Sequence, residues 1–115
     1  MHIKEFSTRV MTFKLAAGLE RYEMDLRRLA GAFLDAELWR RMQQEFGELR
    51  MLGASLPKLS VAWVAVLVSR ARLLQAACGR GAPAFASLLQ EHLAAVEGVR
   101  KRCLRMMGAQ AVVLA

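Results

Sequence analysis

Hydrophobic residues recur along most of this chain at separations of three and four, the repeat that places them on one face of an α-helix. Two series of this kind cover the first third of the chain: Ile3, Phe6, Val10, Phe13 and Ala17, then Leu19, Tyr22, Leu26, Leu29, Phe33 and Ala36. Beyond Gly31 and Asp35 the stripe moves to an offset face through Leu38, Met42, Phe46 and Leu49. The pattern predicts helices over 3–17 and 20–52, with Gly18 separating an N-terminal arm (1–18) from the main helix. Near Gly31 and Asp35, the long helix either bends or has a wide apolar face that contacts two neighbours.

Two short segments, Gly53–Pro57 and Gly79–Pro83, interrupt the second half of the chain. Each has a Gly where a helix would end and a Pro where the next would begin, an asymmetry typical of helix boundaries. They predict helices over 57–78 and 83–107, followed by a short apolar tail at 108–115. We therefore expect a single all-α domain, residues 1–115, folded as a small antiparallel bundle of three long helices plus the N-terminal arm.

An unbroken apolar run, Val61–Val68, lies in the third predicted helix. Eight helical residues cover only about 12 Å, well short of the ~30 Å of a bilayer core, so the run predicts a buried helix and no membrane contact. A helix that is apolar on every side needs protein on every side. Because 56% of the residues are hydrophobic, we expect one chain to leave apolar surface uncovered and to form a homodimer.

The last predicted helix carries the most regular series of the chain. Phe85, Leu89, His92, Val96, Val99, Cys103 and Met106 follow one another at alternating separations of four and three. Such a narrow seam packs against another helix at a shallow angle, either the 57–78 helix of the same chain or a second copy. The candidate interaction residues are therefore Phe85, Leu89, His92, Val96, Val99 and Met106. For His92, a hydrogen-bonded structural role in the seam is the default interpretation.

The chain has 17 Lys and Arg against 10 Asp and Glu, a formal charge of +7 and a pI near 10.5. This charge suits nucleic acid, an anionic surface or an acidic protein. Arg100, Lys101, Arg102 and Arg105 form the clearest basic cluster and are possible anion contacts. The same cluster is also explained by the attraction of cations to the end of a helix.

Side chains that could form a reaction centre are scarce. The chain has two His, His2 and His92, and no spacing typical of a zinc site, a di-iron site or a phosphate-binding loop. We therefore expect no enzymatic activity, no catalytic or metal-ligating residues and no cofactor. Cys78 and Cys103 fall on apolar helical positions and are expected to be buried, reduced thiols. With no secretory signal pattern at the start, a cytoplasmic location is expected.

In size, Ala/Leu/Arg-rich composition, helical layout and lack of a reaction centre, the chain resembles the small helical quorum-sensing anti-activators of the QslA type. The resemblance implies a homodimer that sequesters a transcription regulator, a quorum-sensing activator of the LuxR type, and blocks its dimerisation or DNA binding. It rests on no diagnostic motif, so it implies no functional residue. In this interpretation direct DNA binding is weak or absent. The alternative is a basic helical protein that binds the phosphate backbone of DNA directly.

Overall fold

The computed structural model describes residues 2–32, 34–79 and 82–114, and side chains within 7–32, 34–78 and 84–108. Four α-helices account for most of this part of the chain: α1 (His2–Leu29), α2 (Ala36–Ala54), α3 (Ser60–Gly79) and α4 (Ala82–Leu114). A single 3-10 turn, η1 (Pro57–Leu59), precedes α3. No strand occurs among the described residues, so the predicted all-α class is confirmed.

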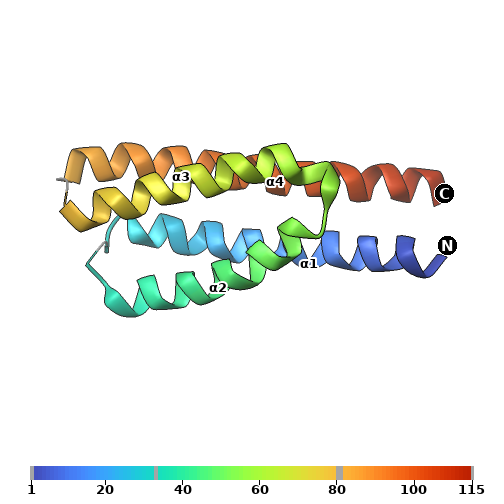
Figure 1. Cartoon of the computed structure of the whole chain (residues 1–115), viewed down its shortest axis with the longest axis horizontal. Helices are drawn as coiled ribbons and strands as arrows, with labels where there is room; N and C mark the ends of the chain where they lie inside the picture. Colours follow the sequence, from blue (N-terminus) through green and yellow to red (C-terminus); the bar gives the residue numbers. More distant parts are fainter. Residues whose placement is uncertain (1, 33, 80–81, 115) are drawn as a thin grey trace.

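The four helices lie side by side along one axis, in a body of 50 × 22 × 20 Å (Figure 1). α1 and α4 are the longest, and they continue together beyond the ends of α2 and α3 towards the two chain termini (Figure 1). We call this extension the stalk and define it as residues 7–14 of α1 and 101–108 of α4. Its two helices are part of α1 and α4, so the predicted N-terminal arm and C-terminal tail are helical within the described residues.

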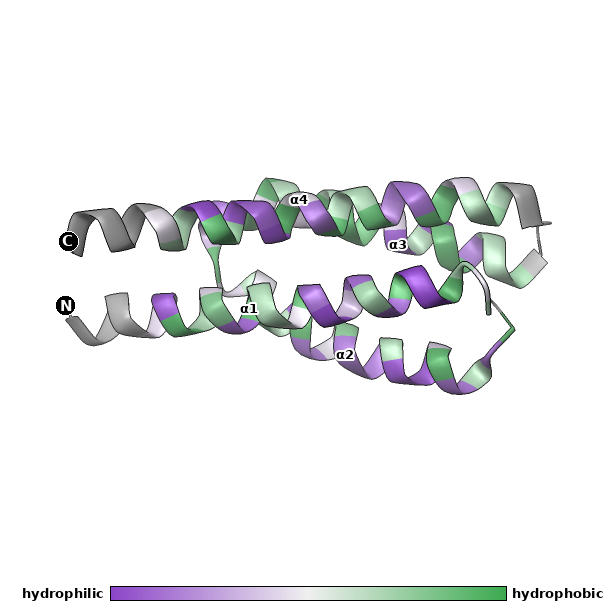
Figure 2. Cartoon of the chain, turned by 180° about the vertical axis from the view of Figure 1, so that it is seen from behind, coloured by the Kyte–Doolittle hydropathy of each residue, from purple (hydrophilic) through white to green (hydrophobic). Residues whose placement is uncertain are grey.

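α4 is the central packing element, because both α1 and α3 make extensive contacts with it. α2 packs mainly on α1 and makes only a few contacts with α3. Figure 2 shows hydrophobic and hydrophilic residues alternating along α1 and α2, as expected for helices with one buried face. The resulting core contains Leu15, Leu19, Tyr22, Leu26, Leu29, Met42, Phe46, Trp63, Val66, Leu73, Leu89, Val96, Val99 and Cys103.

The first boundary differs from the prediction. α1 runs through Gly18 without a break and ends at Leu29, and the next helix, α2, begins at Ala36. Gly18 is buried, and a methyl group added there would lie only 2.6 Å from Leu49 Cδ2 of α2. Position 18 therefore allows the close approach of two helices.

The helix that follows, α2, is capped by Asp35, whose side chain accepts a hydrogen bond from the Leu38 backbone N–H at 3.2 Å. The predicted single helix over 20–52 is therefore wrong, because the chain forms two separate helices there, α1 and α2.

The second boundary falls where Gly53 and Pro57 predict it, but Gly53 has another role. It lies inside the last turn of α2, and no described glycine has a positive φ. An added methyl group at Gly53 would lie 2.7 Å from the ring of Trp63. The glycine thus makes room for an indole in the core, while Pro57 begins η1 as expected.

The apolar run of α3 is buried on one side only, which corrects the prediction. Trp63 and Val66 are 5% and 0% exposed, whereas Val61, Val64 and Val68 are 84%, 56% and 53% exposed. Two apolar faces therefore run along α3, and the chain covers one of them. Counting only eight residues also understated its length. Pro57–Cys78 is long and apolar enough to cross a membrane by length and composition, and only 28% of that stretch is buried.

Candidate functional site

The predicted seam of α4 lies inside the chain. Five of its six candidate interaction residues are at most 5% exposed, and Met106 is half-buried against the core. These five are Phe85, Leu89, His92, Val96 and Val99. Since α1 and α3 of the same chain cover this seam, it offers no free surface to a second protein in this structure.

His92 joins three helices at the centre of this core. Its Nε2 lies 2.8 Å from the hydroxyl of Tyr22 on α1, and its Nδ1 lies 2.8 Å from Oγ of Ser69 on α3. Ser69 Oγ is also 3.0 Å from the carbonyl oxygen of Val66. Sequence reasoning expected a hydrogen-bonded His here but not its partners, which are 70 and 23 residues away.

The hydrogen bonds of this group have one consistent direction. A carbonyl only accepts, so the Ser69 hydroxyl donates to Val66 and its oxygen accepts the Nδ1–H of His92. His92 Nε2 is then unprotonated and accepts from the Tyr22 hydroxyl. Every polar proton in the group has a partner with a neutral imidazole, as a buried polar network requires.

Ser69 and His92 resemble the Ser–His pair of a catalytic site, but they lack the hydrogen-bond direction and the basicity that catalysis requires. Ser69 donates its proton to a backbone carbonyl, so His92 is not placed to remove that proton. Burial, followed by the nearby charge of Arg70, lowers the pKa of His92 to about 4, which makes it a weak base at neutral pH. Ser69 is itself buried. The group is therefore suited to fixing the positions of three helices.

Stability should fall as the pH is lowered through this group's range. Above pH 6.5 His92 is neutral in both the folded and the unfolded chain. Below pH 6.5 the unfolded chain binds a proton at His92, whereas the folded chain binds it only near pH 4. The expected loss approaches about 3 kcal/mol near pH 4. It is measured by urea denaturation at pH 7 and pH 4.5, comparing the protein with His92→Phe.

The comparison isolates His92, because all the other ionisable residues are the same in both proteins. Burial and neighbouring Asp25 raise the pKa of Glu45 to about 7, an effect of opposite sign that both proteins share. His92→Phe should cost less at pH 4.5 than at pH 7. An equal cost at both pH values would contradict a neutral, buried imidazole.

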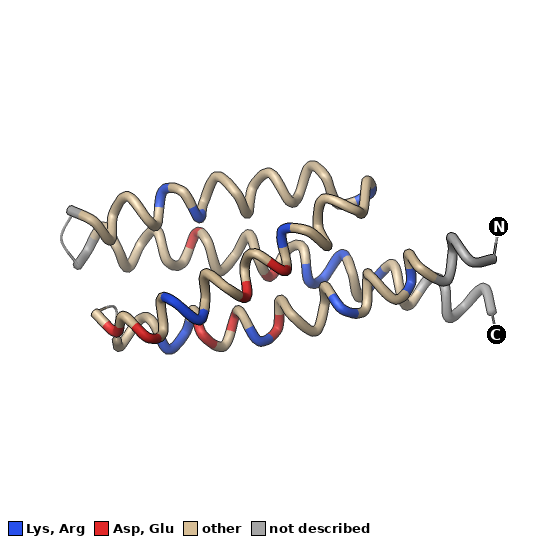
Figure 3. Tube along the Cα trace, turned by 60° about the horizontal axis from the view of Figure 1, so that its bottom comes forward, with Lys and Arg blue, Asp and Glu red and all other residues tan. Residues whose placement is uncertain are grey.

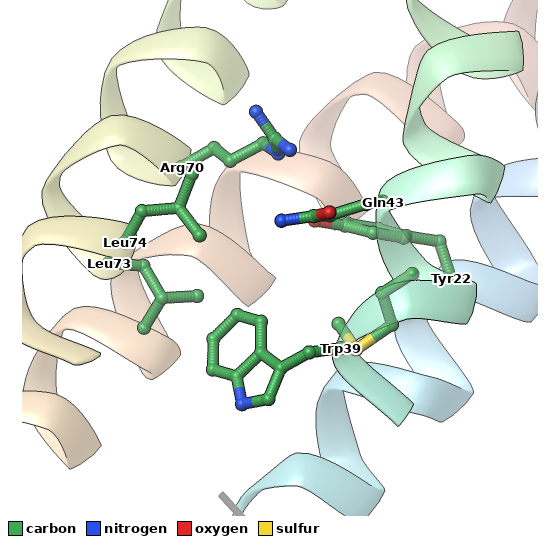
Figure 4. Close-up of a pocket in the computed structure, with 7 residues that line it drawn as sticks. Tyr22, Trp39, Gln43, Arg70, Leu73 and Leu74 are labelled. Atoms are coloured by element: carbon green, nitrogen blue, oxygen red, sulfur yellow. The ribbon is translucent and has the colours of Figure 1, made fainter. Parts of the chain in front are cut away.

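A shallow, partly open hollow lies beside this network. Arg70, Leu73 and Leu74 of α3 face Trp39 and Gln43 of α2 across it, with Tyr22 behind (Figure 4). The Arg70 guanidinium lies 4.2 Å from the centre of the Phe46 ring. The enclosed space of the hollow is only about 10 Å³, room for about one water molecule, against the ~300 to 1,000 Å³ of pockets that hold drug-sized ligands. Among the described residues, no group of three His, Cys, Asp or Glu side chains could hold a metal ion.

The predicted basic cluster divides into two pairs. Arg100 forms an ion pair with Glu23, which is only 2% exposed, and Lys101 lies 3.0 Å from Glu97. Both cations are therefore engaged within the chain. Arg102 and Arg105 are exposed on the stalk, as are Arg9 and Lys14 of α1.

The stalk is consequently the most basic described surface. Neither of its helical segments contains an acid, and Figure 3 shows Lys and Arg without Asp or Glu on the described turns nearest the termini. It also exposes two large apolar side chains, Phe13 (64%) and Leu104 (47%). A surface that combines cations with apolar groups suits an acidic protein partner or a polyanion.

The two thiols lie in different surroundings. Cys103 is fully buried, and burial raises the pKa of its thiol to about 11. Cys78 is exposed on α3, which contradicts the expectation that both are buried. Both thiols are free in this structure.

Fold and surface together define a four-helix protein with a closed polar network in its core, a basic apolar stalk and an uncovered apolar face on α3. Comparison of the chain with protein-family models, with curated proteins and with solved structures finds no match.

Proposed function

We propose that this chain is a non-enzymatic regulatory protein that acts by binding another protein. The observation that carries the proposal is the apolar surface that the folded chain leaves exposed, on the outer face of α3 and on the stalk. Monomeric soluble proteins rarely expose large contiguous apolar patches, and such patches mark association sites. The polar side chains of Tyr22, His92 and Ser69 in the core, by contrast, pair with one another.

In its specific form, the proposal is an anti-activator that works in the cytoplasm as a homodimer of antiparallel helical bundles. Its target is a transcription regulator, a quorum-sensing activator of the LuxR type, whose dimerisation or DNA binding it blocks. This form is supported by the resemblance in size and helical pattern noted above. We assign the contact with the target to the stalk, where Phe13 and Leu104 supply apolar area and the cations form its rim.

Direct DNA binding is the second candidate, and the acid-free stalk favours it. Arg9, Lys14, Arg102 and Arg105 could contact phosphates without sequence specificity. The pairing of Arg100 with Glu23 and of Lys101 with Glu97 weakens it, because those cations already have partners.

Two variants separate the candidates. The LuxR-type activators of the source organism are mixed with the protein, and their DNA binding is measured by fluorescence anisotropy. Phe13→Ser should weaken the inhibition of one activator by roughly tenfold or more, because an apolar anchor is lost from the contact. Arg102→Gln combined with Arg105→Gln should leave that inhibition nearly unchanged.

Salt provides the control. A protein that contacts six to ten phosphates loses about 10³ to 10⁵ in DNA affinity between 50 and 200 mM salt. An apolar protein complex should change little over that range. If the double Arg variant abolished inhibition, or if the protein alone bound DNA at nanomolar concentration in 150 mM salt, the DNA-binding candidate would replace sequestration.

A further inference from the structure

The outer face of α3 has a regular pattern of its own. Val61, Val64, Val68, Ala71, Gln75 and Cys78 are all exposed, and they follow one another at separations of 3, 4, 3, 4 and 3. This is the spacing of the a and d positions of a coiled coil, which in α3 face away from the chain's own core. Leu67 and Leu74, both half-buried, border the stripe on one side.

The pattern carries no charge, although 23% of the chain's residues are charged. Arg72 lies at the edge of the stripe and is paired with Glu91 of α4 at 3.0 Å. An acidic or basic partner would therefore find nothing to pair with on this face. An apolar helix of matching spacing would fit it.

The stripe is complementary to itself when reversed. Its midpoint lies between Ser69 and Arg70, and a half-turn about that point places Val61 opposite Cys78, Val64 opposite Gln75 and Val68 opposite Ala71. A two-fold symmetric dimer requires this kind of match, because the same patch must serve on both copies. In each layer a valine meets a different side chain.

We infer that two copies of this chain associate through antiparallel pairing of their α3 helices, in this register. Antiparallel pairing opposes the two helix dipoles. It also sets the two Arg72 side chains at different levels along the axis, about 7 Å apart by the helical rise. A parallel, in-register pair would place valine on valine, Gln75 on Gln75 and the two Arg72 at one level.

The inference specifies the homodimer named in the proposed function and does not depend on which regulator is the target. It leaves the stalk of each copy free, because the stalk belongs to α1 and α4. Covering α3 also accounts for a stretch of Pro57–Cys78 that is apolar yet only 28% buried in one chain.

Cross-linking with a short bismaleimide tests the register. In the wild type the two Cys78 thiols should lie about 25 Å apart along the axis, so no cross-linked dimer is expected. Val61→Cys should give a cross-linked dimer, because each new thiol faces Cys78 of the other copy. Adding Cys78→Ser to that variant is the matched control and should abolish the product. Cys103 is fully buried and should not react.

Val64→Asp tests the surface itself, because Val64 is 56% exposed and the chain can fold around the change. Light scattering should give twice the chain mass of 12.8 kDa for the wild type and a single chain mass for the variant, with unchanged circular dichroism. A folded Val64→Asp variant that stays dimeric would overturn the inference. Cross-linking of the wild type through Cys78, or of the double variant through position 61, would overturn the antiparallel register.

A membrane is the other possible cover for this face, and one further measurement decides between them. A monomeric wild type that sediments with phosphatidylcholine vesicles, and a Val64→Asp variant that does not, would overturn the dimer in favour of lipid. If the protein forms the cross-linked dimer but does not inhibit DNA binding by any LuxR-type activator, the proposed function would be wrong and this inference would stand.

Discussion

Replacing Val66 with Asp should unfold the protein. Val66 is fully buried on the inner face of α3, so the new carboxylate would lose its hydration in the core. The nearest cation along α3, Arg70, already lies over the Phe46 ring. An uncompensated buried charge costs about 3 to 5 kcal/mol, a large part of the ~5 to 15 kcal/mol that stabilises a typical domain. Circular dichroism at 25 °C should show loss of most helical signal, or a melting temperature far below that of the wild type.

Val64→Asp is the matched control, since it puts the same charge two residues away on the exposed face of the same helix. It should keep the helical signal. A Val66→Asp variant with wild-type helix content and melting temperature would show that the inner and outer faces of α3 have been assigned the wrong way round.

Replacing Trp63 with Ala should cost about 3 to 5 kcal/mol, because a large buried ring leaves a cavity that the core cannot refill. Trp63 is 5% exposed and stacks on Phe46, with ring centres 5.7 Å apart and planes inclined by 13°. Gly53 of α2 also lies against the indole of Trp63, and it has no side chain that could fill the space left by the ring. Urea denaturation followed by circular dichroism measures the loss.

Met51→Ala serves as the control for this prediction, because Met51 is 75% exposed on α2 and its removal opens no cavity. Its cost should stay within about 0.5 kcal/mol. A loss below about 1 kcal/mol for Trp63→Ala would mean that the indole contributes little to the core.

The helical class and the apolar face of α4 could be predicted because their signals are local, whereas the helices that cover this face could not. Phe85, Leu89 and Val96 are separated by whole turns, and polar residues between them mark the opposite face. Gly18 was misinterpreted because a glycine that ends a helix and one that admits a neighbouring helix look the same in sequence. Only the fold brings Leu49 against it.

The boundary between α1, which ends at Leu29, and α2, which begins at Ala36, did have a local signal. Asp35 is a good N-terminal capping residue, and Ala36 and Glu37 after it favour the first turn of a helix. The apolar series through Leu29 and Phe33 to Ala36 obscured that signal, because it continues the helical repeat across the break.

The two faces of α3 could not be separated by hydropathy, because both are apolar. The partners of His92 were equally inaccessible, since Tyr22 and Ser69 meet it only through the packing of α1, α3 and α4. Which apolar face is buried depends on which helices the rest of the chain supplies.

The hydrogen bonds of Tyr22, His92 and Ser69 also bear on how the chain finds one arrangement. Much of its core is Leu, Val and Ala, and a helix slid by one turn would still bury side chains of similar shape. Such a slip moves His92 by about 5.4 Å and separates it from both partners. Each buried polar group left without a partner costs about 1 to 3 kcal/mol. The hydrogen bonds of these three residues thus fix the register of the helices, because a bundle slipped by one turn would lose them although apolar packing alone would tolerate the slip.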